Sequence, residues 1–206
     1  MVFQISGTKE DRIEKIYEES MKDLGKFFEL NWNRNRPSVF LIPDRKTIDS
    51  LKGNNTEDWV VGWSNGNDVF ILSPKNYESE SSHKYSDKEY YALLKHELAH
   101  CFSNIIGNYS QKPIWLLEGI SIFLSGQNNF KNKPKKYSSF INYYGVGGEG
   151  VYHESGFAVE FLVKKYGKKK MLKLLKDSKE ADSKEKFASL FKSIYGFELT
   201  YDNFEI

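Results

Sequence analysis

The chain has 206 residues and a mass of 24.0 kDa, the size of one folded domain rather than of a large multidomain enzyme. Hydrophobic residues make up 39% of it and charged residues 28%, which supplies enough apolar surface for a core and excludes global disorder. Thirty basic residues against 28 acidic ones leave a net charge of +2, too balanced for a general polyanion-binding surface.

The sequence shows neither an export signal nor a membrane-spanning run. No run approaches 18 consecutive apolar residues, and the first residues turn polar at Ser6 without a signal-peptide pattern. A single cysteine, Cys101, excludes an internal disulfide and fits a reducing compartment. We therefore expect a soluble, cytoplasmic protein with neither a membrane nor a nucleic acid as partner. Its oligomeric state stays open.

The first half of the chain predicts helices and a small sheet. Thr8 is expected to cap a long amphipathic helix that runs to about residue 30. The turn sequence Asn65-Gly66-Asn67 predicts a β-hairpin, because Asn and Gly tolerate positive φ. The other expected elements are a strand over 38–42, a short helix from Asp44 to Gly53, hairpin strands over 59–64 and 68–73, and a loop over 77–85.

The second half is predicted to be helical throughout. Ser86 and Glu89 form a capping-box pattern for a helix over 87–106. Pro113 is typical of a first helical turn and Gly126 of a helix end, so a second helix is expected over 113–125. An irregular stretch over 126–150 follows, and then helices over 151–166, 168–177 and 182–195. The pattern predicts one α+β domain over 1–206, with a helix and sheet subdomain over 1–85 and a helical subdomain over 86–206.

His96-Glu97-Leu98-Ala99-His100 is an HExxH sequence inside the predicted helix 87–106. Residues four apart lie one turn apart on the same helical face, so the imidazoles of His96 and His100 can reach one cation. Glu97 lies beside them and can accept a proton from a water molecule at that cation. The motif predicts a metal site with Glu97 as general base.

A catalytic zinc normally takes three protein ligands, so a third ligand is expected downstream. Glu118 stands in an otherwise apolar helix, where an unpaired carboxylate is costly to bury. If the chain turns between Gly107 and Lys112, an antiparallel helix carries Glu118 back over the histidines. Gly119 and Ser121 are small enough to let these two helices approach closely.

The combination of HELAH and Trp115-Leu116-Leu117-Glu118-Gly119, with 17 residues between His100 and Glu118, resembles the gluzincin metallopeptidases. The similarity is closest to the catalytic core of aminopeptidase N relatives and to compact peptidase-MA-like domains. It implies a zincin-like fold with a metal cleft between the two lobes, and one Zn²⁺ held by His96, His100 and Glu118. Glu97 would be the general base for a peptide or protein substrate.

A second resemblance, at Tyr152-His153-Glu154-Ser155-Gly156-Phe157-Ala158, implies a group that stabilises the oxyanion. Aminopeptidase relatives carry a Tyr at this place. Counting back from Gly156 puts His153 on that position, with Tyr152 one residue away. A protonated imidazole donates an equivalent hydrogen bond, so His153 is favoured and Tyr152 kept as the alternative.

The departures from the family refine the prediction. The glycine-rich acidic motif that binds a substrate amino terminus is missing, which favours an endopeptidase over an aminopeptidase. Ile122 stands where thermolysin has an Asp that orients a ligand histidine, so His96 is expected to be oriented by Ser121, Asn104 or a backbone carbonyl. By the same resemblance, strand 68–73 is either the substrate-binding edge of the cleft or an ordinary core strand. The basic run from Lys131 to Lys136 is expected to be a solvated face.

The sequence thus predicts a zinc metallopeptidase, a hydrolase that cleaves peptide bonds by means of a metal-activated water. Two alternatives remain. The domain can be a metal-binding regulatory or protein-interaction module with little peptidase activity, or, more distantly, a basic nucleic-acid-binding protein.

Overall fold

The computed structural model describes residues 7, 10–148 and 150–205. These residues form an α+β fold of seven α-helices and one three-stranded sheet. The expected cap at Thr8 lies outside the described residues. The elements in chain order are α1 (Asp11–Phe28), β1 (Ser38–Ile42), α2 (Arg45–Lys52), β2 (Gly62–Asn65), β3 (Asp68–Leu72), α3 (Asp87–Ile106), α4 (Ile114–Ser125), α5 (Val151–Tyr166), α6 (Lys168–Asp177) and α7 (Lys184–Tyr195).

Local sequence signals set most of these boundaries. The Asp44 carboxylate accepts the backbone N–H of Thr47 at 2.7 Å and so begins α2. The hydroxyl of Ser86 accepts the N–H of Glu89 at 3.2 Å and begins α3. Gly126 ends α4 with a φ of 80°, a conformation that glycine adopts without strain. Pro113 precedes the helix rather than opening it, because its own backbone is extended and α4 begins at Ile114.

The sheet is mixed, with the strand order β1-β3-β2. β3 pairs in parallel with β1 and antiparallel with β2. The expectation that strand 68–73 forms the edge of the cleft is therefore wrong, and its alternative as a core strand holds. β3 takes hydrogen bonds on both sides, and β1 and β2 are the two edge strands.

The segment before β2 is held by Arg45, so the first hairpin strand is shorter than predicted. The guanidinium donates to the carbonyl oxygens of Val60 at 2.7 Å and of Asp58 at 2.9 Å. A carbonyl bound in this way is taken out of the strand ladder, so β2 begins only at Gly62. Val61 still accepts the backbone N–H of Leu72 at 2.8 Å, so residues 59 and 60 form the anchored lead into the edge strand.

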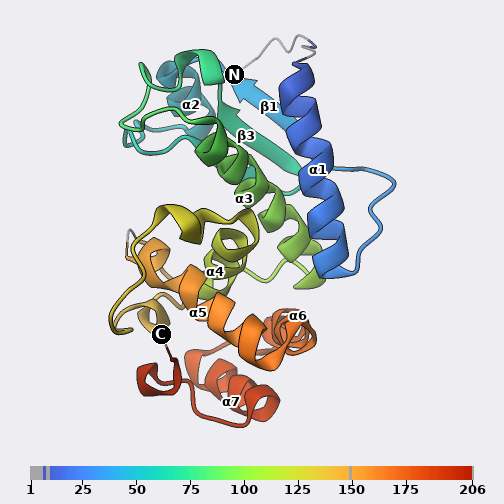
Figure 1. The fold of residues 1–206 in the computed structure, drawn as a ribbon, viewed down its shortest axis with the longest axis vertical. Helices are drawn as coiled ribbons and strands as arrows, with labels where there is room; N and C mark the ends of the chain where they lie inside the picture. Colours follow the sequence, from blue (N-terminus) through green and yellow to red (C-terminus); the bar gives the residue numbers. More distant parts are fainter. Residues whose placement is uncertain (1–6, 8–9, 149, 206) are drawn as a thin grey trace.

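The helix α3 crosses the middle of the molecule (Figure 1). It packs on α1 and on the sheet on one side, and on α4 and α6 on the other. The sheet with α1 and α2 forms one lobe, and α4 to α7 form the other. Because α3 contributes buried side chains such as Leu94 and Phe102 to a continuous core, the two lobes share this helix.

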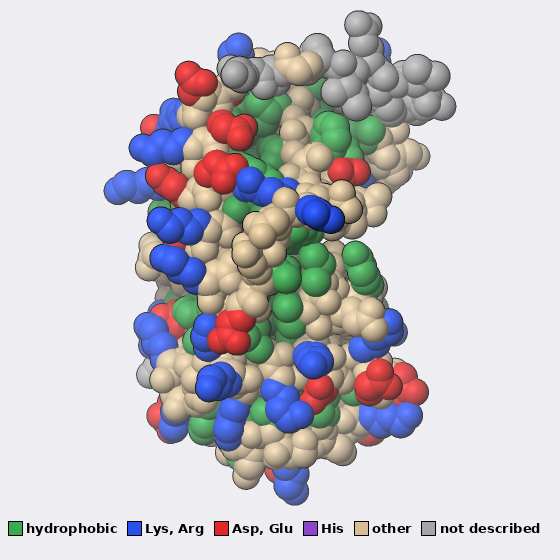
Figure 2. Space-filling model, turned by 90° about the vertical axis from the view of Figure 1, so that its right-hand side faces the viewer, with side chains coloured by type: hydrophobic (Ala, Val, Ile, Leu, Met, Phe, Trp, Pro, Cys, Tyr) green, Lys and Arg blue, Asp and Glu red, His purple; other side chains and the backbone are tan. Residues whose placement is uncertain are grey.

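On the face shown in Figure 2, Lys and Arg side chains are interspersed with Asp and Glu side chains over both lobes, and this face carries no patch of one sign. Among the described residues, no helix has both the length and the apolar character needed to cross a membrane.

Candidate metal centre

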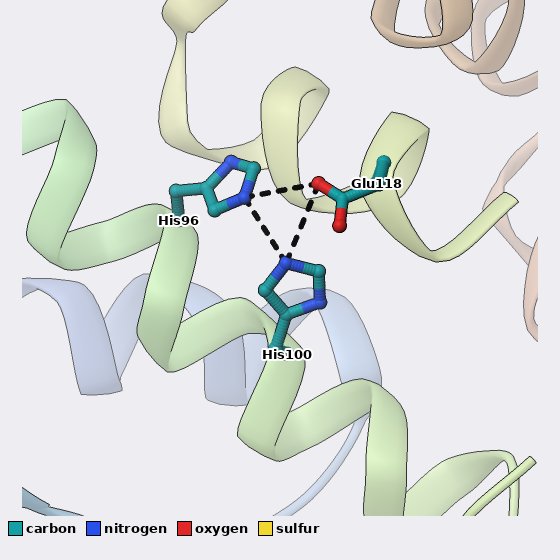
Figure 3. A group of neighbouring side chains, drawn as sticks. All are labelled: His96, His100 and Glu118. Atoms are coloured by element: carbon teal, nitrogen blue, oxygen red, sulfur yellow. Dashed lines mark hydrogen bonds and ion pairs between the residues drawn. The ribbon is translucent and has the colours of Figure 1, made fainter. Parts of the chain in front are cut away.

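The two histidines of the HExxH sequence lie on one face of α3 and point toward the second lobe (Figure 3). Their Nε2 atoms are 3.0 Å apart. Only 6% of the His96 surface is exposed to solvent, because the site lies where α3 is covered by α4. The helical spacing thus directs both imidazoles at one point, as residues four apart on a helix do.

Glu118 reaches the same point from α4 (Figure 3). Its Oε2 atom lies 3.3 Å from Nε2 of His96 and 3.6 Å from Nε2 of His100. One ligand atom from each of the three side chains falls within 4.8 Å of the others. The structure therefore brings together the three residues that were predicted from the sequence to be ligands.

The spacing of these atoms fits a small tetrahedral cation. Zinc bonds to nitrogen and oxygen measure about 2.0–2.2 Å, so neighbouring ligand atoms of a tetrahedral site are separated by about 3.3–3.6 Å. The observed separations of 3.0, 3.3 and 3.6 Å are close to that range. Oε2 of Glu118 is also buried and accepts no hydrogen bond from the described residues. A cation would satisfy this oxygen, which otherwise carries the cost of desolvation.

The ionisation of the cluster follows from its crowding. Burial raises the pKa of Glu118, but the neighbouring imidazoles of His100 and His96 outweigh it and hold the pKa of this carboxyl below its usual range. Burial lowers the pKa of His100, but the negative charge of the Glu118 carboxylate outweighs burial and raises this pKa to about 9. A proton and a cation thus compete for the same nitrogen lone pair, so cation binding should release a proton.

His96 is oriented by Gln127, a residue that was not predicted from the sequence. The side-chain oxygen of Gln127 lies 3.0 Å from Nδ1 of His96. Because an amide oxygen only accepts, Nδ1 carries the hydrogen and Nε2 presents its lone pair to the site. The predicted partners do not make this contact: the buried hydroxyl of Ser121 has no partner among the described residues, and Asn104 lies in the cleft wall.

Gln127 has no recognisable signal in the sequence. It follows Gly126 in the short 3₁₀ helix η2 (Gln127–Phe130), which turns back over α3 after α4 ends. Only the three-dimensional path of that turn places an amide next to His96.

Glu97 lies beside the cluster with only 6% of its surface exposed. Its carboxyl group packs against the edge strand: a Cβ atom added to Gly62 would stand 3.5 Å from Oε1 of Glu97. Burial raises the pKa of Glu97, and the imidazoles of His96 and His100 oppose that rise. A buried carboxylate with a raised pKa is a better proton acceptor than an exposed one.

The cluster opens into a cleft of about 1440 Å³. This volume exceeds the roughly 300–1,000 Å³ typical of small-molecule pockets. One wall is formed by residues 59–66, which include β2, and α3 forms the floor. The opposite wall contains residues from the segments 109–118, 127–131, 145–147 and 151–152.

Tyr152 lines this cleft, whereas His153 is exposed and takes no part in the lining. Both residues are in the first turn of α5, where neighbouring side chains point about 100° apart. The structure thus places the alternative, Tyr152, in the cleft wall and the favoured residue, His153, outside it. Burial raises the pKa of the Tyr152 hydroxyl, and the negative charges of Glu118 and Glu97 add to the rise.

Lys131, at the end of η2, also differs from its prediction. It lines the cleft and is half-buried, not part of a solvated face. Its Nζ donates to the backbone carbonyl of Tyr152 at 2.9 Å. Burial lowers the pKa of Lys131 to about 8, and Glu118 opposes that shift.

No family model, curated protein or solved structure matches this chain. Its function must therefore be inferred from the site. Two imidazoles and a carboxylate converge at the floor of a large cleft, with a buried carboxyl and a tyrosine hydroxyl nearby.

Proposed function

We propose that this chain is a zinc-dependent peptidase of the gluzincin type, built on a zincin-like fold. The observation that carries the proposal is the convergence of Glu118, from α4, on the two imidazoles of the HExxH sequence. A lone HExxH sequence can arise by chance in a protein that binds no metal. A third ligand that arrives from a separate helix, at a spacing suited to zinc, makes a chance arrangement much rarer.

Two nitrogen ligands and one carboxylate suit zinc, with His96, His100 and Glu118 as the residues that would hold it. When bound, Zn²⁺ would polarise the peptide carbonyl and lower the pKa of a water molecule to about 7. The hydrogen bond from His96 to Gln127 fixes the ring in the tautomer that presents its Nε2 lone pair.

Glu97 and Tyr152 supply the proton transfer and the charge stabilisation. The buried carboxylate of Glu97 would accept a proton from the attacking water and pass it to the leaving amine. Tyr152 keeps its proton because its pKa is raised, so its O–H remains a donor for the oxygen on which negative charge develops. Both side chains face the cleft in which the substrate would lie.

The cleft suits an extended polypeptide. The free edge of β2 lies along one wall and offers backbone groups for pairing with a substrate strand. Three exposed aromatic side chains, those of Trp59, Tyr109 and Phe130, also line the cleft. Of the lining carboxylates other than Glu97 and Glu118, the described residues offer only the exposed Glu89 for a substrate amino group. An endopeptidase is therefore favoured over an aminopeptidase.

The substitution Glu97→Gln tests the proposal. It removes the proton acceptor but leaves the three ligands, so zinc content should stay at one ion per chain while peptide cleavage falls by a factor of about 10² or more. Zinc is measured by elemental analysis, and cleavage by mass spectrometry of a mixed peptide library. Glu89→Gln, at an exposed carboxylate of the same cleft, is the control that should retain activity.

Two results would contradict the peptidase function. One is cleavage by Glu97→Gln at the rate of the unsubstituted chain. The other is a zinc-loaded, unsubstituted chain that cleaves no peptide of the library, which would favour a metal-binding interaction module.

A further inference from the structure

Lys131 is a cation in the cleft wall that has no role in the reaction described above. Its ammonium group donates one hydrogen bond, to the carbonyl oxygen of Tyr152, and lies 5.9 Å from the centre of that residue's ring. An ammonium group has three N–H donors, so two remain for other partners. No ion pair between described residues includes Lys131.

A half-buried lysine without a carboxylate partner is unusual, because burial of a charge is costly unless it is paired. The other two lysines of the cleft, Lys84 and Lys112, are exposed and therefore solvated. Glu118 acts on Lys131 through its charge but is directed at the two imidazoles. A dication bound to that carboxylate would neutralise its charge, and Lys131 would then lack Glu118 as a counter-ion.

We infer that Lys131 binds a carboxylate group of the substrate and so makes the cleft selective for peptides that carry a carboxylate near the cleaved bond. This inference rests on the proposed peptidase function. An acidic side chain and a free carboxyl terminus offer the same group, and either would accept the two remaining N–H donors. Partial burial shields such a pair from water, which makes it stronger than an ion pair to Lys84 or Lys112.

Peptide binding tests the inference without any dependence on turnover. The full chain with Glu97→Gln is loaded with zinc and titrated by calorimetry with four acetylated pentapeptides. All four have the sequence Ala-Phe-Xaa-Phe-Ala. Xaa is Glu or Gln, and the carboxyl terminus is either free or amidated. We expect at least one peptide with a carboxylate to bind roughly 10- to 100-fold more tightly than the Gln peptide with an amidated end. The arm that shows the preference identifies the source of the carboxylate.

Two variants in the same background assign the preference to Lys131. Lys131→Met should reduce the ratio of the dissociation constants of the neutral and carboxylate peptides to about one, whereas Lys131→Arg should keep a preference for the carboxylate. Lys112→Met, which removes an exposed cation of the same cleft, is the matched control and should keep the ratio of the parent. Zinc content and circular dichroism establish that each variant is folded.

Several results would overturn the inference. Equal affinities of the parent for all four peptides would do so even if Lys131→Met did not fold. An equal loss of affinity for neutral and carboxylate peptides in Lys131→Met would assign the lysine a structural role instead. Cleavage by the unsubstituted chain without any preference for a carboxylate would remove this inference alone. If the chain showed a Lys131-dependent preference for a carboxylate but cleaved no peptide, the carboxylate site would be supported and the peptidase function would be excluded.

Discussion

Glu118 is the residue on which the candidate metal centre depends most. It is the one proposed ligand outside α3, and its Oε2 has no donor among the described residues. Removal of this carboxylate leaves two imidazoles, which are too few for a closed zinc site. Loss of this carboxylate should therefore weaken metal binding first, and lower the rate of any reaction only as a consequence.

We expect Glu118→Ala to lose bound zinc, whereas the unsubstituted chain retains about one ion per molecule after gel filtration. Elemental analysis of the two proteins measures the difference. Glu89→Gln serves as the control because it also removes a carboxylate from the cleft, but an exposed one, and the amide oxygen can still accept the hydroxyl of Ser86 at the start of α3. Equal zinc content in Glu118→Ala and the unsubstituted chain would exclude Glu118 from the site.

Gln127 acts on the site through His96. We expect Gln127→Ala to weaken zinc binding by about 10- to 100-fold, because the imidazole loses the acceptor that fixes its tautomer and orientation. Competition with a chromogenic chelator measures the affinity. Asn104→Ala is an informative control: Asn104 was one of the predicted partners, but the structure places it in the cleft wall without contact to the His96 ring nitrogens. A larger loss of affinity in Asn104→Ala than in Gln127→Ala would reverse the assignment.

At the scale of elements, the crossing of α4 and α5 holds Glu118 in place. Gly119, the next residue after this ligand, packs against α5 so closely that an added Cβ would lie 2.6 Å from the carbonyl oxygen of Ser155. This corrects the sequence-based interpretation, in which Gly119 allowed α4 to approach α3. The small residue is required because backbone atoms of α5 occupy the space where a side chain would be.

Gly119→Ala should therefore separate α4 from α5 and lower the free energy of unfolding by about 1–3 kcal/mol, the usual cost of overpacking. Urea denaturation measures this loss, and zinc affinity should fall with it because Glu118 moves with α4. In Ser121→Ala, a hydroxyl with no partner among the described residues is removed from the same buried helix, and stability should stay nearly unchanged. A Gly119→Ala protein as stable as the unsubstituted chain would show that the helices can separate freely.

The elements themselves were largely predictable, because their signals are local. The caps at Asp44, Ser86 and Gly126 act within a few residues, and the structure confirms all three. The strand order was not predictable, since the pairing of β1 with β3 joins segments that a helix and another strand separate. The early interruption of the first hairpin strand likewise depends on Arg45, a distant side chain that binds the carbonyl of Val60.

The residues of the candidate site likewise fall into a group that local sequence signals predict and a group that they do not. The positions of His96, Glu97 and His100 follow from helical spacing alone, and the convergence of Glu118 needed only one short turn between two helices. The positions of three other residues depend on the path of the irregular segment between α4 and α5: Gln127, Lys131 and Tyr152. Residue periodicity does not predict that path.

At the scale of the whole molecule, a buried carboxylate ties that irregular segment to the helical lobe. Glu154, on α5, accepts the backbone N–H groups of Ser138, Ser139 and Phe140 at 2.8–3.1 Å. Burial raises the pKa of Glu154, but these three N–H donors outweigh it and lower the pKa below its usual value. The folded state therefore binds this proton less readily than the unfolded state does.

The lowered pKa of Glu154 makes the stability of the folded state depend on pH. A lowered pKa stabilises the folded state above the pKa of the unfolded carboxyl, about 4.3, and this contribution is lost as the pH falls through the folded value. We expect Glu154→Gln to lower the free energy of unfolding at pH 7 by about 1–3 kcal/mol. Urea titrations between pH 3 and pH 7 should show this difference shrinking with acidity. Glu180→Gln, at an exposed carboxylate, should track the unsubstituted chain throughout.

The short length of β2 also limits what the proposed peptidase would attack. The free edge spans four residues and ends at the turn through Gly66 and Asn67, so a partner strand runs out of backbone groups after a few residues. A target must therefore offer an extended segment of that length that is not folded into its own structure. Compact domains would stay intact, and only surface loops, tails or denatured chains would be trimmed.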